Sequence, residues 1–478
     1  MQGSNQNEPT NLASRALSAE EARRVWQQDR DHVIHPWQNI PGFHAEGALI
    51  MNAAQGVYVY DAAGKRYLDG MGGLWCVNMG YGREDIVEAM SNQARQLCYY
   101  SPFTNIGNVP AARLASKLAE LAPGDLNHAF FTCGGSTAND TAYRLIQFYQ
   151  GSRGKPEKRH VITRIRAYHG STYLTASLSG NPPDRNRHLS FETDGIHQVS
   201  LPTLYRRPDG LSESEFCDQL VAELRNKILE LGPENVSAFF AEPIMGSGGV
   251  IVPPSGYQRR TWELCREFDI LYVSDEVITA FGRLGHFFAS DELFGVEPDL
   301  IIFAKGVTSG YQPLGGVLFS DRMHDALLAA DPDSYFTNGY TYSGHPVACA
   351  AALANIEAME GEEICAHVRD VGPYFMQRLS ELLDLEIVGD VRGSHLMACV
   401  ENVRDRKTKE PFPAGVDVGS MVARHCGDLG LIVRPLGAHN VLSPPLTITR
   451  SQVDDFVRIL REGIVRTQDQ LRRDGVMA

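Results

Sequence analysis

Between residues 127 and 320 the chain alternates short apolar segments with longer amphipathic ones. Continuous apolar runs rich in β-branched and aromatic residues are typical of strands buried on both faces, and the segments between them have the period of a helix. This alternation predicts βαβ units and an α/β domain with a mostly parallel central sheet flanked by helices. The predicted strands are HAFFT (128–132), HVITRI (160–165), VSAFFAE (236–242), ILYVSD (270–275), LIIFAK (300–305) and GGVLFS (315–320), and two typical helices are NDTAYRLIQFYQ (139–150) and YQRRTWELCREF (257–268).

The two ends of the chain predict a second, smaller α+β domain. Residues 18–34 have helical periodicity with Ser18 as N-cap, and residues 56–70 read as a hairpin around the turn 61–64. The C-terminal third has fewer buried strands and more surface helix, after a helix that begins near Pro346. We expect these parts: a disordered lead-in (1–17), the small domain's N-terminal part (18–75), a large α/β domain (76–335) and the small domain's C-terminal part (336–478).

Charge and cysteine usage exclude several classes of function. The net charge is −14 with no local basic block, so neither nucleic acid nor an anionic membrane surface is an expected partner. The nine cysteines are scattered without C-x-x-C spacing, which indicates neither a disulfide framework nor a metal site. The N-terminus lacks the apolar region of a secretory signal, and no apolar run reaches the roughly 18 residues of a membrane helix. We expect a cytoplasmic protein.

Lys305 ends the apolar run Leu300–Ala304. In an open α/β sheet, ligands bind beyond the carboxyl ends of the strands. Desolvation at such a site lowers the pKa of a lysine, and its neutral amine can form Schiff bases. The alternative is a lysine whose stem packs on the strand while its head reaches water.

Asp275 ends the preceding predicted strand in "ILYVSDEVITAFGR". A buried carboxylate needs a cationic partner, and a protonated pyridine nitrogen is one. An N-cap for the following segment is the alternative.

A glycine turn follows the strand that ends at Thr132. Gly134 and Gly135 make the turn and Ser136 opens a helix, so backbone N–H groups and a hydroxyl point at one place, which suits phosphate. A plain turn is the alternative. The sequence does not match G-x-G-x-x-G, which counts against a dinucleotide site, and Gly64-Lys65 lacks the first glycine and the Ser/Thr of a phosphate loop.

Tyr168 follows the strand "VITRI" in "RAYHGST". Its ring can lie on a planar cofactor or simply pack half-buried. Together, a Schiff-base lysine, a carboxylate for a pyridinium, a phosphate cradle and a stacking aromatic describe pyridoxal phosphate, which imposes those groups on its host.

From about Trp37 to Gln468 the sequence resembles the class III, fold-type I pyridoxal-phosphate aminotransferases, and within them the ω-amino acid:pyruvate transaminases. The motifs that carry the resemblance are LDGMGGLWCVNMGYGR, YHGST, AEPIMGSGGVIVPP, SDEVITAFGR, FAKGVTSGYQPLGG, YTYSGHPVACAAAL and LIVRPLGAHNVLSPPL.

The resemblance implies a role for each matching residue. Lys305 would bind pyridoxal 5'-phosphate as a Schiff base and then move the proton between substrate and cofactor, and Asp275 would keep the ring nitrogen protonated. Val277 and Tyr168 would pack on the two ring faces. The family builds its active sites across the interface of a homodimer, with a tetramer left open. The implied cofactor-binding residues are Gly134, Gly135, Ser136, Tyr168, His169, Glu242, Asp275, Val277, Lys305 and Thr341, the last reaching the phosphate from a second subunit.

Arg434 in "LIVRPLG" aligns with the arginine that binds the acceptor's carboxylate, and its guanidinium suits a bidentate contact. A surface ion pair is the alternative. Leu74, Trp75 and Phe103 would line the substrate pocket together with Tyr168, although each could equally belong to the core.

The sequence departs from the family's pattern in two places. Thr137 replaces a glutamate that is common after the phosphate turn, which puts the hydrogen bonding there in doubt. Ile278 and Ala280 replace the glutamine and glycine of ornithine- and GABA-type relatives, and Ile278 cannot hydrogen-bond the cofactor's ring oxygen. With apolar Trp75, this favours pyruvate over 2-oxoglutarate as acceptor.

The leading hypothesis is therefore ping-pong transamination from an ω-amine or ω-amino acid to pyruvate, giving alanine. β-Alanine, taurine, diamines and aryl amines all stay open as donors. The alternatives are a 2-oxoglutarate-dependent enzyme, an aminomutase or decarboxylase on the same cofactor, and a catalytically silent binding protein, because fold does not fix function.

Overall fold

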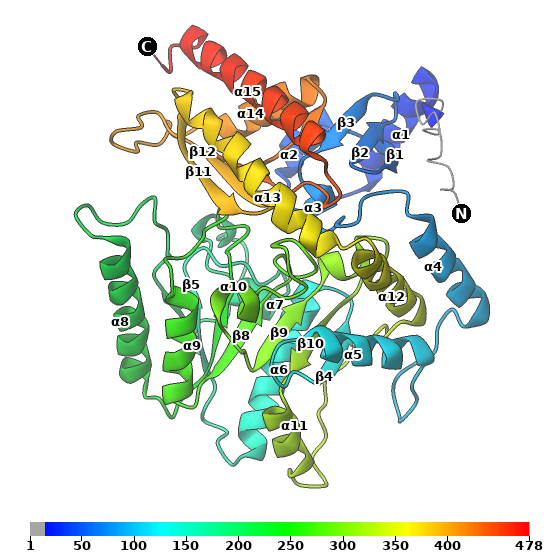
Figure 1. Cartoon of the computed structure of the whole chain (residues 1–478), viewed down its shortest axis with the longest axis vertical. Coiled ribbons are helices and arrows are strands. Elements are labelled where there is room, and N and C mark those ends of the chain that lie inside the picture. The colour runs from blue at the N-terminus through cyan, green and yellow to red at the C-terminus, as the bar shows by residue number, and fades with distance from the viewer. Residues whose placement is uncertain (1–14, 478) are drawn as a thin grey trace.

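The computed structural model describes residues 15–477, apart from the side chain of Pro183 (Figure 1). The predicted lead-in lies outside this range except for residues 15–17. The helices are α1 Ala19–His32, α2 Ile40–Glu46, α3 Gly72–Trp75, α4 Glu84–Gln96, α5 Val109–Leu121, α6 Gly135–Ser152, α7 Tyr173–Leu178, α8 Glu213–Leu231, α9 Tyr257–Glu267, α10 Ser290–Phe294, α11 Asp321–Leu328, α12 Pro346–Gly361, α13 Ile364–Ser380, α14 Val418–Asp428 and α15 Arg450–Arg473, with 3-10 turns at η2 Pro182–Asp184, η3 Lys305–Thr308 and η4 Glu381–Asp384.

The central sheet has seven strands in the order β4-β10-β9-β8-β7-β5-β6. Only β10 runs against its neighbours, so the prediction of a mostly parallel sheet is confirmed. All six predicted strands are present, and β6 was missed. The bounds are β4 His128–Thr132, β5 His160–Arg164, β6 Ile196–Val199, β7 Val236–Ala241, β8 Leu271–Asp275, β9 Leu300–Phe303 and β10 Gly315–Phe319.

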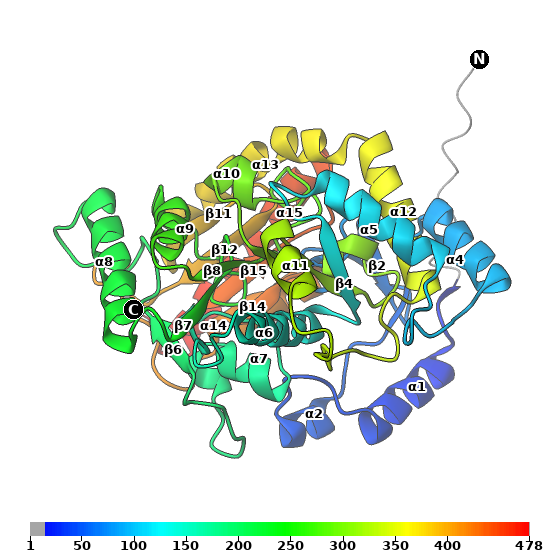
Figure 2. The same cartoon turned by 90° about the horizontal axis from the view of Figure 1, so that it is seen from below.

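Helices cover both faces of this sheet (Figures 1 and 2). Successive residues of a strand point to opposite faces, and Phe239 and Phe240 of β7 accordingly join different core clusters. Phe240 packs with Ala142 and Leu145 of α6, while Phe239 packs with Leu224 of α8 and other residues of α8 and α9. The central strands β7, β8, β9 and β10 are buried on both faces as their unbroken apolar runs predict, whereas β4 and β6 at the sheet edges are only partly buried.

Two smaller sheets lie above the large one in Figure 1. One combines the predicted hairpin with a strand from the far end of the chain: β1 Met51–Gln55, β2 Tyr58–Asp61, β3 Arg66–Asp69 and β13 Leu431–Ile432, where Leu68 is paired in parallel with Leu431. The other is β11 Val388–Ser394, β12 Met397–Asn402, β15 His439–Leu442 and β14 Arg434–Leu436. A smaller α+β part built from both chain ends is therefore present, and the boundaries at 75 and 335 stay a prediction.

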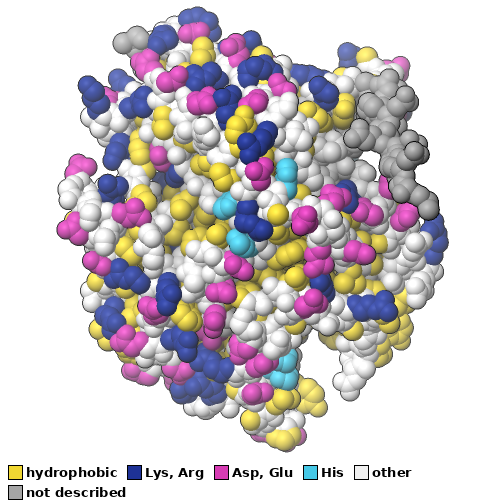
Figure 3. All heavy atoms as spheres, viewed as in Figure 1, with side chains coloured by type: hydrophobic (Ala, Val, Ile, Leu, Met, Phe, Trp, Pro, Cys, Tyr) yellow, Lys and Arg dark blue, Asp and Glu magenta, His cyan; other side chains and the backbone are white. Residues whose placement is uncertain are grey.

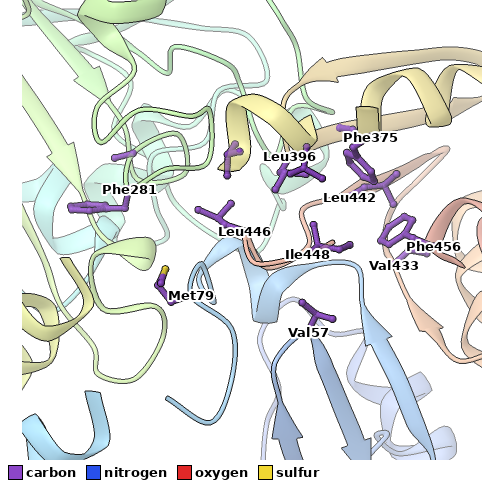
Figure 4. Close-up of a cluster of buried hydrophobic side chains, with 14 of the residues drawn as sticks. Val57, Met79, Phe281, Phe375, Leu396, Val433, Leu442, Leu446, Ile448 and Phe456 are labelled. Carbon is purple, nitrogen blue, oxygen red and sulfur yellow. The ribbon is translucent and has the colours of Figure 1, made fainter. Parts of the chain in front are cut away.

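One apolar cluster joins these layers (Figure 4). It brings Val57 of the N-terminal part together with Phe375 and Phe456 of the C-terminal part and Phe281 of the large sheet's loops. Buried Arg283 ties the same parts together, donating to the backbone oxygens of Leu396 (3.0 Å) and Pro444 (2.6 Å). The loops that follow β8 and β9 are thus held against both chain ends.

The surface drawn in Figure 3 mixes acidic and basic side chains, without a continuous basic patch on that face. In the part of the chain that the structure describes, no helix has the length and apolar character needed to cross a membrane.

Candidate active site

A cavity of about 150 Å³ lies at the carboxyl ends of β7, β8 and β9, beside the start of α6. Eight of the residues predicted to form the site line it: Gly135, Ser136, Tyr168, His169, Glu242, Asp275, Val277 and Lys305. The sheet topology brings them together, because parallel strands present their carboxyl ends at one edge.

Lys305 stands two residues beyond the end of β9 and lines this cavity. Its φ of 48° is in the left-handed region, which a side-chain-bearing residue adopts at a cost of order 1 kcal/mol that the surrounding fold must offset. Burial lowers the pKa of its amine, and neighbouring Cys76 and Asp275 oppose that shift. The stem-packing alternative places the amine in water, whereas here the amine is buried enough for its pKa to be lowered.

Asp275 lines the same cavity and has a buried carboxylate that is held by hydrogen bonds. Its Oδ2 lies 2.7 Å from His169 Nδ1 and accepts a hydrogen bond from Asn139 Nδ2 at 2.9 Å. Its Oδ1 accepts from the backbone N–H of Val277 at 3.2 Å. The segment after Asp275 forms turns and no helix, so the N-cap alternative does not apply.

The predicted glycine turn forms the N-terminus of α6. A Cβ on Gly135 would lie 3.1 Å from both methyl carbons of Val277, and one on Gly170 would lie 2.6 Å from Ser136 Oγ. These glycines therefore let the turn, the loop of Tyr168 and the loop of Val277 converge. Ser136 Oγ accepts from the backbone N–H of Ser171 at 3.1 Å.

Thr137, which replaces the common glutamate, bonds within the turn. Its Oγ1 donates to the carbonyl oxygen of Gly134 at 2.9 Å, and its own carbonyl accepts from the hydroxyl of Tyr340 at 3.1 Å. The replacement thus braces the turn locally.

Glu242 positions the backbone around Tyr168. Its Oε1 accepts from the Tyr168 N–H at 3.1 Å and its Oε2 from the Gly246 N–H at 2.8 Å. Burial raises the pKa of this carboxyl. The Tyr168 ring meets Trp37 edge-on, with ring centroids 6.1 Å apart.

Arg434 begins β14 and is partly buried. Burial lowers the pKa of its guanidinium, against the opposing influence of Tyr168 and Asp184. Its charge also lowers the pKa of Lys305, so the two side chains are close enough to interact. Among the described residues no carboxylate lies within ion-pair distance of Arg434, which leaves no support for the surface ion pair.

Six predicted site residues do not line this cavity in a single chain, and Arg434, described above, is one of them. Gly134 lies in the turn immediately behind it, and Trp75, 1% exposed, packs with Ile244 and Ile278, which do line it. Leu74 is 39% exposed. Phe103 lines a separate cavity with Gly339, and exposed Thr341 accepts a hydrogen bond at its backbone oxygen from Tyr99.

Sequence reasoning missed Asn139, Gly170 and Ile244 as lining residues. Asn139 lies one helical turn after Gly135 and therefore on the same face of α6, a spacing that could have identified it. No sequence pattern indicates that Gly170 and Ile244 line the cavity, and only the folded structure shows it.

Comparison with known proteins places this geometry in a family. The family model for class III aminotransferases matches residues 43–464. The chain is 42% identical to putrescine–pyruvate aminotransferase of Pseudomonas aeruginosa over 446 residues, 93% of this chain and 96% of that protein. It superposes on a crystal structure of an (S)-enantioselective omega-transaminase from Thermomicrobium roseum with a TM-score of 0.90 and 39% identity, covering 95% and 99% of the two chains. The omega-transaminase of Pseudomonas jessenii in complex with PMP gives a TM-score of 0.90 at 36% identity, covering 93% and 98%. The chain belongs to the class III aminotransferases.

Proposed function

We propose that the protein is a pyridoxal-phosphate-dependent ω-transaminase that moves the amino group of an ω-amine or ω-amino acid to pyruvate, giving alanine. The observation that carries the proposal is that Lys305 and Asp275 line one cavity at the strand ends, the amine with a lowered pKa and the carboxylate held by His169 and Asn139.

The residues of the cavity fit pyridoxal phosphate. The close approach of Gly135 to Val277 leaves a cradle that a Cβ would crowd, and the N-terminus of α6, an 18-residue helix, favours an anionic phosphate there. Asp275 suits a protonated ring nitrogen, and Tyr168 and Val277 suit the two faces of a planar ring. When bound, this cofactor supplies the electron sink for the carbanion that forms at the substrate carbon.

The chain's own groups then have separate tasks. Lys305 Nζ, neutral at lower pH than an ordinary lysine, would hold the cofactor and would move a proton to and from the substrate carbon. Asp275 would keep the ring nitrogen protonated, and His169 and Asn139 fix the orientation of its carboxylate. Glu242 holds the backbone of Tyr168 and so the position of the aromatic ring.

Pyruvate as acceptor is supported by two features. Arg434 offers a guanidinium without an ion-pair partner among the described residues, which matches a carboxylate. Ile278 lines the cavity with an apolar side chain, where a glutamine is typical of ornithine- and GABA-type relatives. The P. aeruginosa relative is named for pyruvate.

We also propose an obligate homodimer in which Phe103 and Thr341 complete the site of a second copy. Both are exposed in a single chain, Phe103 at 51%, and each has an exposed aromatic residue nearby in the sequence, Tyr100 (53%) and Tyr342 (58%). Large apolar side chains gathered at one surface are typical of a protein interface.

The test is a donor panel of β-alanine, taurine, putrescine and an aryl amine, each supplied with pyruvate to the holoenzyme, with alanine formation measured. Turnover of 2-oxoglutarate with pyruvate ignored would reject the acceptor. Carbon dioxide release, or amine migration without a keto acid, would identify a decarboxylase or aminomutase. Borohydride reduction should leave a pyridoxyl adduct on Lys305, and its absence would favour a silent scaffold.

A further inference from the structure

Asp184 ends the short turn η2 beside a second cavity. This outer cavity has a volume of about 470 Å³ and shares Tyr168 and Gly170 with the cavity of Lys305. The segment between α1 and α2 forms another part of its lining, with Ile34, His35, Trp37 and Gln38. The two cavities therefore adjoin at Tyr168 and Gly170, and Asp184 lines the outer one.

The walls of the outer cavity are mostly apolar and aromatic, with Trp37, Leu189 and Phe191 among them. Among the described residues that line it, Asp184 contributes the only carboxylate. The one imidazole, that of His35, is engaged by Asp29 at 2.9 Å. An alkyl chain in this cavity would therefore meet apolar side chains, and a cation would find one anionic partner, Asp184.

Asp184 is not neutralised by a basic side chain. No lysine, arginine or histidine lies within ion-pair distance of its carboxylate in the described part of the chain. Its neighbour Arg185 points elsewhere, donating to the backbone oxygens of Ser177 (2.9 Å) and Ser179 (3.1 Å) and covering the ring of Phe191. The side chain of Asn181 hydrogen-bonds this carboxylate, whose remaining lone pairs are left for a ligand cation.

Burial raises the pKa of Asp184 and the charge of Arg434 opposes that shift, while the same charge adds to the lowering of the pKa of Lys305 by burial. Arg434 repels an ammonium and attracts a carboxylate, whereas Asp184 does the reverse. The two halves of a ping-pong reaction use substrates of opposite charge, and these two side chains provide one group for each.

We infer that Asp184 binds the distal ammonium of a diamine donor, with Trp37 and Tyr168 flanking the alkyl chain. The inference rests on the proposed function and narrows its donor class to diamines. A cation near the face of an aromatic ring gains additional attraction, so Trp37 contributes to the same preference.

The experiment compares putrescine with n-butylamine, which has the same carbon chain and no distal ammonium. The holoenzyme's donor half-reaction is followed by the change in cofactor absorbance, for the wild type and for Asp184→Asn. A charge-assisted contact of this kind is worth roughly 10- to 100-fold, so kcat/KM for putrescine should fall by about that factor while that for n-butylamine changes by less than about threefold.

Activity toward n-butylamine reports that the variant is folded and loaded with cofactor. Asp209→Asn, an exposed carboxylate on the loop before α8, controls for the change of net charge. Equal losses for both amines, no loss for either, or a selective loss in Asp209→Asn would overturn the inference.

The assay also separates this inference from the function on which it rests. If the wild type makes alanine from pyruvate with either amine, the proposed function holds, and only the ratio between amines in Asp184→Asn decides the role of Asp184. If it makes alanine from neither, nor from the wider donor panel, both fail.

Discussion

His169 Nδ1 and Asp275 Oδ2 lie 2.7 Å apart, and both side chains are buried beneath the cavity of Lys305. The other ring nitrogen, Nε2, lies 3.2 Å from the hydroxyl of Thr163 on β5. A carboxylate held in this way keeps one orientation, because its orienting partner is itself held by a neighbouring strand.

Replacing His169 with alanine should weaken cofactor binding and lower kcat by about 10- to 100-fold, because Asp275 loses a partner that fixes it. Cofactor affinity is measured by titrating the apoenzyme and following absorbance. His32→Ala, at the exposed end of α1, serves as the matched control. If His169→Ala keeps wild-type affinity and turnover, the histidine only fills space.

The stability of the apoenzyme should depend on pH through Lys305. Burial lowers its pKa in the folded state from 10.5, so between that lowered value and 10.5 the unfolded chain binds more protons, and stability rises with pH. Apo Lys305→Met lacks this penalty. It should therefore be more stable than the wild type at pH 7, with a difference that shrinks as pH approaches 10.5.

Urea unfolding of both apoproteins across that range measures this effect. Lys407→Met, which removes an exposed lysine, gives the baseline for losing one positive charge. A difference that stays constant or grows with pH would contradict the assigned direction.

Arg434→Ala should raise KM for pyruvate by roughly 10- to 100-fold, because a charge-assisted contact to the acceptor's carboxylate is lost. The donor half-reaction with n-butylamine should change little, since that amine has no carboxylate. Separate kinetics of the two half-reactions provide the measurement. Exposed Arg406→Ala is the control, and equal effects on both half-reactions would argue for a structural role.

Mixing inactive subunits should restore activity if the site spans two copies. Lys305→Ala and Thr341→Ala are each expected to have low activity as homodimers. In a mixed dimer, one site carries both changes and the other carries neither, so activity should return toward half of the wild-type value per dimer. Failure of co-expressed, differently tagged subunits to regain activity would place Thr341 outside the partner's site.

Arg283→Met should destabilise the protein by about 3 kcal/mol, because three buried acceptors lose their donor. These acceptors are the carbonyl oxygens of Leu396 and Pro444 and the side-chain oxygen of Asn78, 3.0 Å from the guanidinium. Burial lowers the pKa of Arg283 to about 10, so it is still cationic at neutral pH. A urea midpoint equal to that of the control Arg23→Met, on exposed α1, would refute the prediction.

The strands that build the site could be predicted because each is an uninterrupted apolar run between turns, as in Leu300–Phe303. The four-residue strand Ile196–Val199 could not, because it lies at the sheet edge, includes His197 and Gln198, and buries only Val199 fully. A strand can be recognised from the pattern of apolar residues only where its side chains are buried and therefore must be apolar.

The site residues also differ in how far the sequence predicts them. Lys305 and Asp275 are polar residues at the ends of apolar strands, so the local sequence identifies them as candidates. The local sequence does not identify Asp184 as a candidate, because the cavity that it lines is formed together with residues 34–40, which are far away in the chain. The positions of Phe103 and Thr341 depend on a second copy, which the pattern of one chain does not describe.

The parallel pairing of Leu68 with Leu431 also bears on how this protein is made. The ribosome must deliver nearly all of the polypeptide before the strand at Arg66–Asp69 finds its neighbour. Until then a nascent chain carries an uncovered β edge, which invites aggregation. Expression at reduced temperature or with added chaperones should therefore improve the yield, and a chain cut short before residue 431 should accumulate as insoluble material.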